Sequence, residues 1–200
     1  MDRYMERNNY QTEESHIHLE SNVRAAYERI TKTLIRTGHS VTAMESCTGG
    51  MIASLLTDTE GASGILKGTY VTYSNEAKTA CGVPEQVIKE YGVYSIQTAE
   101  AMAMAARHAY NADLGIGITG SFGNVDPANS DSIPGEIYAA VSFLDSMKSE
   151  PFVLPLGLDR HTYKLLAAHH TADLILGVLM NSGIAASDEN STVTDCMEGK

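Results

Sequence analysis

Apolar positions along the chain follow two different periods, and segments of the two kinds alternate. Between 23 and 36, apolar residues recur at steps of three and four, which predicts an amphipathic helix. Short runs rich in β-branched and aromatic residues, such as 68–73, predict strands. The same criteria predict further strands at 41–45, 114–119, 136–143 and 152–156, and helices at 48–58, 84–91, 95–110 and 160–180.

This alternation of helices with strands is typical of α/β proteins, in which helices cover both faces of a sheet. We therefore expect a three-layer α/β/α sandwich around a mostly parallel, mixed sheet. In such sheets, ligands bind beyond the carboxyl ends of the strands. Three polar segments follow predicted strands in this way, namely Glu45-Ser46, Ser74-Asn75 and Thr119-Gly120.

The helix and strand patterns occupy one continuous part of the chain. No proline- or serine-rich linker and no internal repeat interrupts 15–180, which predicts a single domain there. Residues 1–14 are polar and charged, and 181–200 are acidic with few groups to bury, so we expect both segments to be disordered. The N-terminal segment shows no apolar core of a signal peptide.

Composition narrows the choice of partners. The 200 residues carry a formal net charge of -11, which argues against a general nucleic-acid binder, because such proteins present a basic face. No apolar run approaches the roughly 18 residues that span a bilayer, so no membrane partner is expected. Cys47, Cys81 and Cys196 have neither metal-ligand spacing nor the even number of a disulfide framework, which favours a reducing, cytoplasmic location.

The segment Glu45-Ser46-Cys47-Thr48-Gly49-Gly50 places three nucleophile-type side chains between a predicted strand and a predicted helix. The glycines let the backbone approach a ligand closely, and the free N–H groups of a helix N-terminus attract anionic oxygen. The N–H groups of 48–50 are therefore candidates for an oxyanion hole. The alternative is a capped helix in which Thr48 caps and the glycines serve packing, and the segment alone does not separate the two.

A hydroxyl nucleophile needs a base, and the histidines offer none in a suitable place. His16 and His18 lie near the N-terminus, and the three histidines of 160–180 suit solvated or capping positions. The HExxH, GxSxG and GK[ST] patterns do not occur in the sequence. This argues against a metal hydrolase, an α/β-hydrolase and a Walker-type phosphate loop.

A lysine is the other side chain that could act as the base. Lys78 lies in 73–78, where the chain turns from a predicted strand into a helical turn. A lysine base must be neutral, and at its ordinary pKa only about one part in a thousand is neutral at pH 7.4. Burial or a neighbouring cation would have to lower that pKa. The pattern alone does not favour Lys78 over Lys67 or Lys89, and a surface lysine at a helix end is the more ordinary interpretation.

Two segments, AMESCTGG at 43–50 and YVTYSNEAK at 70–78, carry a specific resemblance. They resemble the C-terminal domain of the competence/damage-inducible protein CinA, a family whose stand-alone members are nicotinamide-nucleotide amidohydrolases. The resemblance covers about 23–180, nearly the whole predicted domain. Further matching segments follow in order at 82–84, 91–95, 112–120, 135–138 and 159–160.

The resemblance implies a serine amidohydrolase with a Ser46/Lys78 dyad and with no metal or other cofactor. Ser46 would attack the carboxamide of nicotinamide mononucleotide, a pyridine nucleotide, and Lys78 would accept the hydroxyl proton. Ammonia would leave, and water would hydrolyse the acyl-enzyme to nicotinate mononucleotide. Members of the family are commonly oligomeric, which implies a homo-oligomer, at least a dimer.

The resemblance also implies roles for residues around the dyad. Tyr73, Asn75 and Thr119 would line the pocket and orient the dyad or the amide. Arg160 would contact a phosphate or lower the pKa of Lys78. The expected oxyanion and substrate-binding residues are Glu45, Thr48, Gly49, Gly50, Tyr73, Asn75, Thr119, Gly120 and Arg160.

Two neighbours of the proposed nucleophile have contrasting interpretations. Adjacent side chains at a strand end point to opposite faces, so Ser46 and Cys47 are not expected to face the ligand together. The resemblance favours Ser46, and Cys47 then becomes a small buried residue. Glu45 would either bond the loop backbone or, near Lys78, hold that lysine protonated and oppose base catalysis.

The segment 121–132 departs from the family pattern. After Thr119-Gly120 the family has Ile-Ala-Gly-Pro, a glycine-rich run and a Lys-Pro-Val-Gly element. This chain has Asp126 and Asp131 in that region and Ser132 in place of the lysine. A glycine-rich turn offers N–H groups to phosphate, whereas aspartates facing the site would repel it. Two alternatives therefore stay open, an amidase with a different substrate and a non-catalytic nucleotide-binding or regulatory protein.

Overall fold

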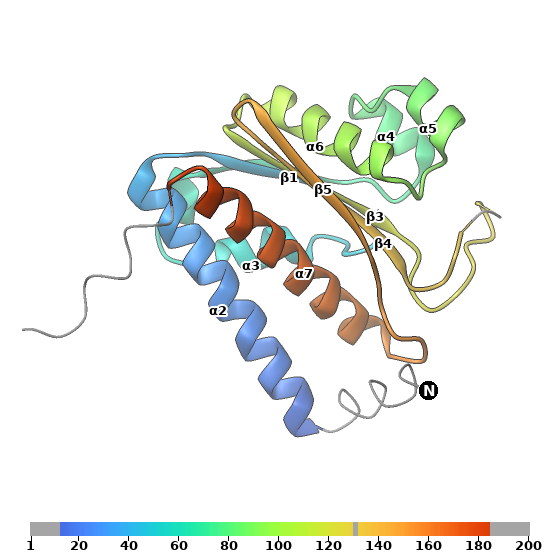
Figure 1. Ribbon diagram of the computed structural model, residues 1–200, viewed down its shortest axis with the longest axis horizontal. Helices are drawn as coiled ribbons and strands as arrows, with labels where there is room; N and C mark the ends of the chain where they lie inside the picture. Colours follow the sequence, from blue (N-terminus) through green and yellow to red (C-terminus); the bar gives the residue numbers. More distant parts are fainter. Residues whose placement is uncertain (1–12, 130–131, 185–200) are drawn as a thin grey trace, which may run out of the picture.

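In the computed structural model, which describes residues 13–129 and 132–184, five strands form one mixed sheet in the order β2-β1-β3-β4-β5. Helices pack on both faces of this sheet, which confirms the expected α/β/α fold class (Figure 1). The elements in chain order are α2 (Glu13–Thr37), β1 (Val41–Glu45), α3 (Met51–Thr57), the short 3-10 helix η1 (Ala62–Gly64), β2 (Leu66–Val71), α4 (Asn75–Ala80), α5 (Glu85–Tyr91), α6 (Ile96–Tyr110), β3 (Leu114–Gly120), β4 (Glu136–Phe143), β5 (Ser146–Val153) and α7 (Arg160–Asn181).

The strand directions define where a ligand can bind. Strand β1 pairs in parallel with β2 on one side and with β3 on the other, whereas β4 and β5 run antiparallel to their neighbours. After β2 the chain crosses back over β1 to form β3. The carboxyl ends of β1 and β3 therefore flank a topological switch point, the usual position of a ligand site in an open α/β sheet.

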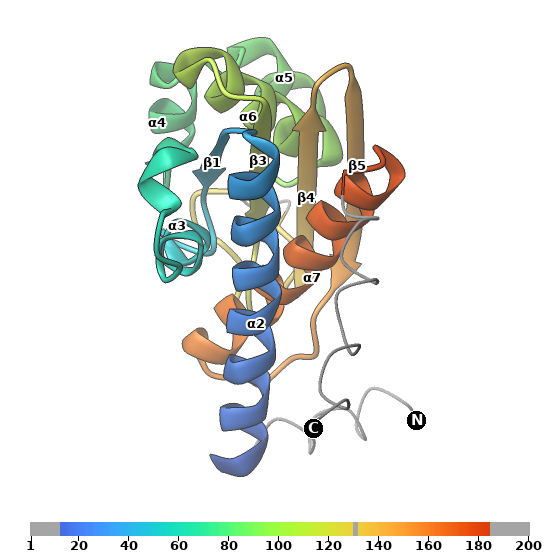
Figure 2. The same cartoon turned by 90° about the vertical axis from the view of Figure 1, so that its left-hand side faces the viewer.

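Two layers of helices enclose the sheet. One layer consists of α6 with α4 and α5 beside it, and the other of α2, α3 and α7 (Figures 1 and 2). Helix α6 lies close to the central strands because β3 contains glycines. A Cβ on Gly117 would lie only 2.0 Å from the Ala99 carbonyl oxygen of α6. On the opposite face, Tyr27 of α2 is fully buried and its hydroxyl donates to the Ala168 carbonyl oxygen of α7 at 3.0 Å.

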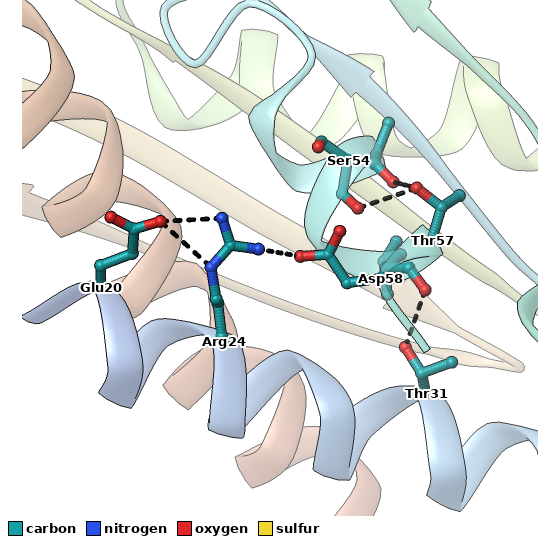
Figure 3. Close-up of polar contacts among 8 residues, drawn as sticks. Glu20, Arg24, Thr31, Ser54, Thr57 and Asp58 are labelled. Atoms are coloured by element: carbon teal, nitrogen blue, oxygen red, sulfur yellow. Dashed lines mark hydrogen bonds and ion pairs between the residues drawn. The ribbon is translucent and has the colours of Figure 1, made fainter. Parts of the chain in front are cut away.

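Polar contacts join α2 to the C-terminal end of α3 (Figure 3). The guanidinium of Arg24 donates to Glu20 one turn earlier and forms an ion pair with Asp58, the C-cap residue of α3. Thr31 Oγ1 donates to the Leu56 carbonyl oxygen at 3.3 Å. The charged groups are exposed, so they orient α2 against α3 more than they stabilise the fold.

Helix α2 begins at Glu13, ten residues before the start expected at 23. Its first turns are mostly polar, with Leu19 as a buried residue, so apolar periodicity does not reveal them. Glu13 and Glu14 lie in the first turn, where negative charge is favourable because of the helix dipole. Local charge therefore extends a helix whose apolar face starts at Val23.

Two strands also differ from their expected bounds. Strand β2 covers Leu66–Val71 rather than 68–73, and β5 covers Ser146–Val153 rather than 152–156. Strand β5 lies at the edge of the sheet, so its sequence needs no continuous apolar run, and Pro151 within it is tolerated there.

The segments expected to be disordered are described only at their inner margins. Glu13 and Glu14 instead form the first turn of α2, and α7 continues to Asn181. Residues 1–12 and 185–200 lie outside the described residues. Within the described ranges, none of the helices is both long enough and apolar enough to cross a membrane.

Candidate active site

Ser46 follows β1 directly and lies at the carboxyl edge of the sheet. Its N–H donates to the Ile118 carbonyl oxygen of β3 at 3.1 Å, which continues the strand pairing one residue beyond Glu45. The side chain is almost buried, with 8% exposed. Main-chain pairing thus fixes Ser46 at the switch point.

Lys78 reaches Ser46 from the helix that follows β2. Ser74 caps α4 by accepting from the Ala77 N–H at 3.1 Å, and this short helix directs Lys78 inward, where 1% of it is exposed. Lys78 Nζ lies 3.1 Å from Ser46 Oγ and donates to the Thr72 carbonyl oxygen at 2.8 Å. The two side chains form a buried pair although 32 positions separate them in the sequence.

Burial lowers the pKa of Lys78 to about 8, while the charges of Cys47 and Asp126 act in the opposite direction. Burial, followed by the charge of Glu45, raises the pKa of the Cys47 thiol to about 12, so this thiol is uncharged at neutral pH. Asp126 is therefore the group that opposes the lowered Lys78 pKa near neutrality. Burial is the cause found to lower this pKa, so a phosphate contact is the role of Arg160 taken up below.

Cys47 lies next to Ser46 but packs with the apolar core. It is 4% exposed and belongs to the buried cluster between the sheet and the α2 and α7 layer. Some of its atoms also border the cavity described below. A neutral, buried thiol is a poor nucleophile, because the thiolate is the reactive form.

Glu45 supports the turn and not the dyad. Its buried carboxylate accepts hydrogen bonds from the N–H groups of Gly50, Ile52 and Ala53 at 3.0, 3.1 and 2.9 Å. These are donors that the N-terminus of α3 would otherwise leave unpaired. No charge effect of Glu45 on Lys78 is found among the described groups. Of its two expected roles, bonding the loop backbone is the one observed.

The oxyanion hole expected from the N–H groups of 48–50 needs correction. The Gly49 N–H donates to the Ser46 carbonyl oxygen at 3.1 Å, and the Gly50 N–H is taken by Glu45. The Thr48 and Cys47 N–H groups have no oxygen acceptor within the described part of the chain. Gly50, with φ of 94°, is the N-cap of α3, so Thr48 does not cap this helix. In the described ranges the buried Thr48 Oγ1 has no hydrogen-bond partner.

A cavity of about 380 Å³ lies next to Ser46 at this edge of the sheet. Several expected site residues do not line it: Glu45, Thr48, Gly49 and Gly50 lie in the turn, and Thr119 is buried, with Oγ1 donating to the Val93 carbonyl oxygen at 3.0 Å. Those that do line it are Ser46, Tyr73, Asn75, Gly120 and Arg160. Lys78 is not one of the lining residues and contacts Ser46, which is.

Arg160 provides a cation at the cavity. It is the first residue of α7, and its Nη2 donates to the Tyr73 hydroxyl at 2.9 Å. Its guanidinium lies 5.1 Å from the centre of the Phe122 ring, and Phe122 in turn stacks on Tyr163 of α7. Tyr73 is 64% exposed, so this cation lies at the solvent side of the cavity.

The segment 121–129, in which the sequence departs from the family pattern, forms a wall of the cavity. Asp126 lines the cavity, and its carboxylate accepts a hydrogen bond from the Tyr94 hydroxyl at 2.6 Å. Asn129 connects this segment to α4, because the Asn75 amide donates to Asn129 Oδ1 at 3.0 Å. Tyr94 lies in the segment 91–95 that resembles the family, whereas 121–129 departs from the family pattern. Asp131 lies outside the described residues.

These features define an α/β protein with a buried serine–lysine pair beside a cavity at the carboxyl edge of its sheet. The sequence pattern of the CinA C-terminal domain family matches this chain over residues 23–179. The chain belongs to the CinA C-terminal domain family.

Curated relatives are similar over much of this chain. A CinA-like protein of Desulfovibrio desulfuricans is 38% identical over 139 residues, which cover 68% of this chain and 32% of that protein. A putative competence-damage inducible protein of Streptococcus agalactiae serotype Ia is 36% identical over 143 residues, 70% of this chain and 33% of that protein. The chain thus spans about a third of the length of these relatives.

Solved structures of similar proteins share the fold. A competence-damaged protein (CinA) superfamily protein from Escherichia coli has a TM-score of 0.69 at 26% identity, covering 78% of this chain and 90% of that chain. A CinA superfamily protein from Klebsiella pneumoniae has a TM-score of 0.72 at 21% identity, covering 80% of this chain and 98% of that chain. At that identity, the second likeness concerns the fold alone.

Proposed function

We propose that this protein is an amidohydrolase that deamidates nicotinamide mononucleotide to nicotinate mononucleotide and ammonia. The observation that carries the proposal is the 3.1 Å contact between Lys78 Nζ and Ser46 Oγ, made by two buried side chains beside a cavity. A hydroxyl within hydrogen-bond reach of a base is the arrangement that nucleophilic catalysis requires. The resemblance to the nicotinamide-nucleotide amidohydrolases of the CinA C-terminal domain family supports the same reaction.

The surroundings of Lys78 suit a base. With a pKa of about 8, about a fifth of Lys78 is neutral at pH 7.4, compared with about one part in a thousand for an ordinary lysine. One N–H of the neutral amine donates to the Thr72 carbonyl oxygen at 2.8 Å. This contact fixes the amine and leaves its lone pair for the Ser46 proton.

The first half of the proposed reaction joins Ser46 Oγ to the amide carbon. Lys78 takes the hydroxyl proton as the bond forms, and the carbonyl electron pair moves to oxygen to give a tetrahedral oxyanion. When the oxyanion collapses, the C–N bond breaks, and the Lys78 ammonium passes the proton to the departing nitrogen, which leaves as ammonia. An ester of Ser46 remains.

Water completes the cycle. Neutral Lys78 accepts a proton from a water molecule as the water oxygen adds to the ester carbon. The second tetrahedral intermediate collapses with cleavage of the bond to Ser46 Oγ, and Lys78 returns the proton to that oxygen. The product is the carboxylic acid, which ionises to nicotinate mononucleotide.

The turn after Ser46 supplies the oxyanion donors in this proposal. The N–H groups of Gly49 and Gly50 already donate within the turn. Those of Cys47 and Thr48 have no oxygen acceptor among the described residues, and their present acceptor is the Cys47 sulfur. They directly follow the nucleophile, near which the oxyanion forms. The Cys47 side chain is not needed for this role, because the donor is its backbone.

Arg160 supplies the phosphate contact in the same proposal. A guanidinium presents several N–H groups in a planar fork that matches phosphate oxygens. At this site, it lies over the Phe122 ring and next to the Tyr73 hydroxyl, which hold it at the solvent side of the cavity.

Ammonia release from nicotinamide mononucleotide tests the proposal. We expect Ser46→Ala and Lys78→Ala each to lower kcat/KM by about 1000-fold or more, because each removes a member of one reacting unit. Cys47→Ala keeps its backbone N–H and should keep turnover. Lys89→Ala is the matched control for the lysine change, because Lys89 is an exposed residue paired with Glu85. Full activity in Ser46→Ala, or its loss in Cys47→Ala, would contradict the proposed dyad.

The changed segment 121–129 favours one alternative, an amidase with a different substrate. Asp126 lines the cavity where a glycine-rich phosphate loop is expected in the family. A wild-type protein that leaves nicotinamide mononucleotide intact but releases ammonia from another amide through Ser46 would establish that alternative. Binding of the nucleotide without ammonia release, equal in wild type and Ser46→Ala, would instead indicate a non-catalytic nucleotide-binding protein.

A further inference from the structure

The carboxylate of Asp126 takes no part in the chemistry above, yet it lies in the same cavity as Ser46. The Tyr94 hydroxyl and the Asn129 amide both donate to Oδ2, each at 2.6 Å. The Ala128 N–H donates to Oδ1 at 2.9 Å. Three donors from two parts of the chain therefore fix the position of this negative group.

A second set of contacts fixes the segment that carries Asp126. The Asp126 N–H donates to the hydroxyl of the buried Ser132 at 2.7 Å. Asn129 Oδ1 accepts from Asn75, the first residue of the helix that carries Lys78. The carboxylate is thus tied to the same helix that positions the base.

The electrostatic properties of this carboxylate also indicate a fixed negative charge at the cavity. Hydrogen bonds from Tyr94, then from Asn129 and Ala128, lower the pKa of Asp126, so it is ionised at neutral pH. Its charge raises the pKa of Lys78, and its side chain lines the same cavity as Ser46. A fixed negative charge at this place disfavours a phosphate and favours a positive group.

We infer that Asp126 selects substrates whose carboxamide is carried on a positively charged ring, by facing that charge while Ser46 faces the amide carbon. The inference rests on the proposed function and adds to it a residue that distinguishes a charged ring from a neutral one. Substitution at the ring nitrogen of nicotinamide creates a permanent positive charge, whereas free nicotinamide is neutral. With Arg160 taking the phosphate, the cavity offers one fixed charge of each sign to a zwitterionic nucleotide.

Another carboxylate lines the cavity but is held differently. Glu76 lies in the first turn of α4, where its own backbone N–H and then the Ser74 hydroxyl lower its pKa. It is exposed, so solvent and salt screen its charge. Only Asp126 combines a place in the cavity with a charge that acts on Lys78 among the described carboxylates.

Binding of 1-methylnicotinamide tests the inference, because this probe has the charged ring but neither ribose nor phosphate. Nicotinamide is the neutral counterpart, and the full-length Ser46→Ala protein prevents turnover during an NMR titration. In that background, we expect Asp126→Asn to weaken binding of the cation about tenfold and binding of nicotinamide less than about twofold. Asparagine keeps the size of the side chain and suits the same turn geometry, so the change removes mainly the charge.

Asp145→Asn is the matched control. It removes the same charge from the turn between β4 and β5, at the end of the sheet opposite to Ser46. We expect it to leave both affinities unchanged. Asp126→Glu is the second variant, which keeps the charge and is expected to keep the preference for the cation should the asparagine variant not fold.

Equal weakening of both probes in Asp126→Asn, or no weakening of either, would overturn the inference, as would an equal effect of Asp145→Asn. Ammonia release separates this result from the proposed function. Binding of the cation through Asp126 without any ammonia release would keep the inference and refute the hydrolase. Turnover of nicotinamide mononucleotide with the same kcat/KM in Asp126→Asn would keep the hydrolase and refute the inference.

Discussion

The turn after β1 and the segment after β3 meet at the same edge of the sheet, but they are held in different ways. In the turn 45–50, the Glu45 carboxylate is fully buried and bonded to three main-chain N–H groups. In 121–129, Asp126 is partly exposed, and two of its three donors are side chains. Main-chain donors are present whatever the side chains are, whereas side-chain donors change with single substitutions.

In the proposed reaction, the turn 45–50 therefore serves catalysis, and the segment 121–129 serves selection of the ligand. The turn presents Ser46 through main-chain contacts, and the Glu45 carboxylate bonds the turn itself. The segment 121–129 borders the cavity, and side chains such as Tyr94 and Asn129 hold its carboxylate in place. In many proteins, a rigid scaffold holds the reacting groups, and a loop on that scaffold selects the ligand.

The largest effect is expected where Ser46 of the turn loses its base, Lys78 of α4. Lys78→Met keeps the length of the side chain but removes the amine, so we expect kcat/KM to fall about 1000-fold or more. Because a buried charge is replaced by an apolar group, the protein should be as stable as the wild type or more so. Ammonia release and urea unfolding measure the two effects. A variant with more than a tenth of wild-type activity would show that Lys78 is not the base.

A large effect on stability is expected at the same turn. Glu45→Gln removes the negative charge and one of the two acceptor oxygens that bind three main-chain N–H groups. We expect it to lower the free energy of unfolding by about 3 kcal/mol. Asp126→Asn should lower it by less than about 1 kcal/mol, because its surroundings are partly exposed. Urea unfolding compares the two variants. Equal losses would mean that the two regions are not held differently.

The sequence predicted the interior of the fold better than its margins. Strands β1, β3 and β4 were found within one residue because their apolar runs are buried on both faces. The polar start of α2 and the edge strand β5 bury little, so no apolar period marks them. Apolar periodicity reports burial, and it fails where an element is stabilised by charge or by pairing along one edge.

The candidate site was predictable in part, and mainly through the family resemblance. Ser46 and Lys78 meet because β1 and β2 are parallel neighbours with Glu45 opposite Val71. This register cannot be predicted from the two segments taken separately. The role of Glu45 depends on which way a buried side chain turns. The position of Asp126 in the wall at 121–129 depends on Tyr94, which lies 32 positions earlier, and no local pattern pairs the two residues. Contacts of this kind arise only when the sheet assembles.

The pH dependence of activity should reveal the environment of the base. Because burial lowers the pKa of Lys78 to about 8, kcat/KM should rise about tenfold per pH unit below pH 8 and level off above it. The same shift affects stability. Between pH 8 and 10.5 the unfolded state binds more protons at this lysine, so its contribution to stability should increase with pH across that window.

The pH profile of an Asp126 variant tests whether the segment 121–129 acts on Lys78. Asp126→Asn removes a charge that raises the pKa of Lys78, so its acid limb should move to lower pH, whereas Asp145→Asn should leave the limb in place. A profile that is flat between pH 6 and 9 in the wild type would contradict a lysine base in this environment. An unchanged limb in Asp126→Asn would mean that the two regions act independently.

The smallest effect is expected for Asn129→Ala. The change removes one donor to Asp126 and the contact with Asn75, but the Tyr94 hydroxyl and the Ala128 N–H still hold the carboxylate. We expect KM for nicotinamide mononucleotide to rise about threefold with little change in kcat, since a single net hydrogen bond is worth about 1 kcal/mol. Steady-state kinetics of ammonia release, with Asn181→Ala at the end of α7 as the control, measure both constants. A fall in kcat at constant KM would show that this segment positions the dyad through α4, and the division between chemistry and ligand choice would then fail.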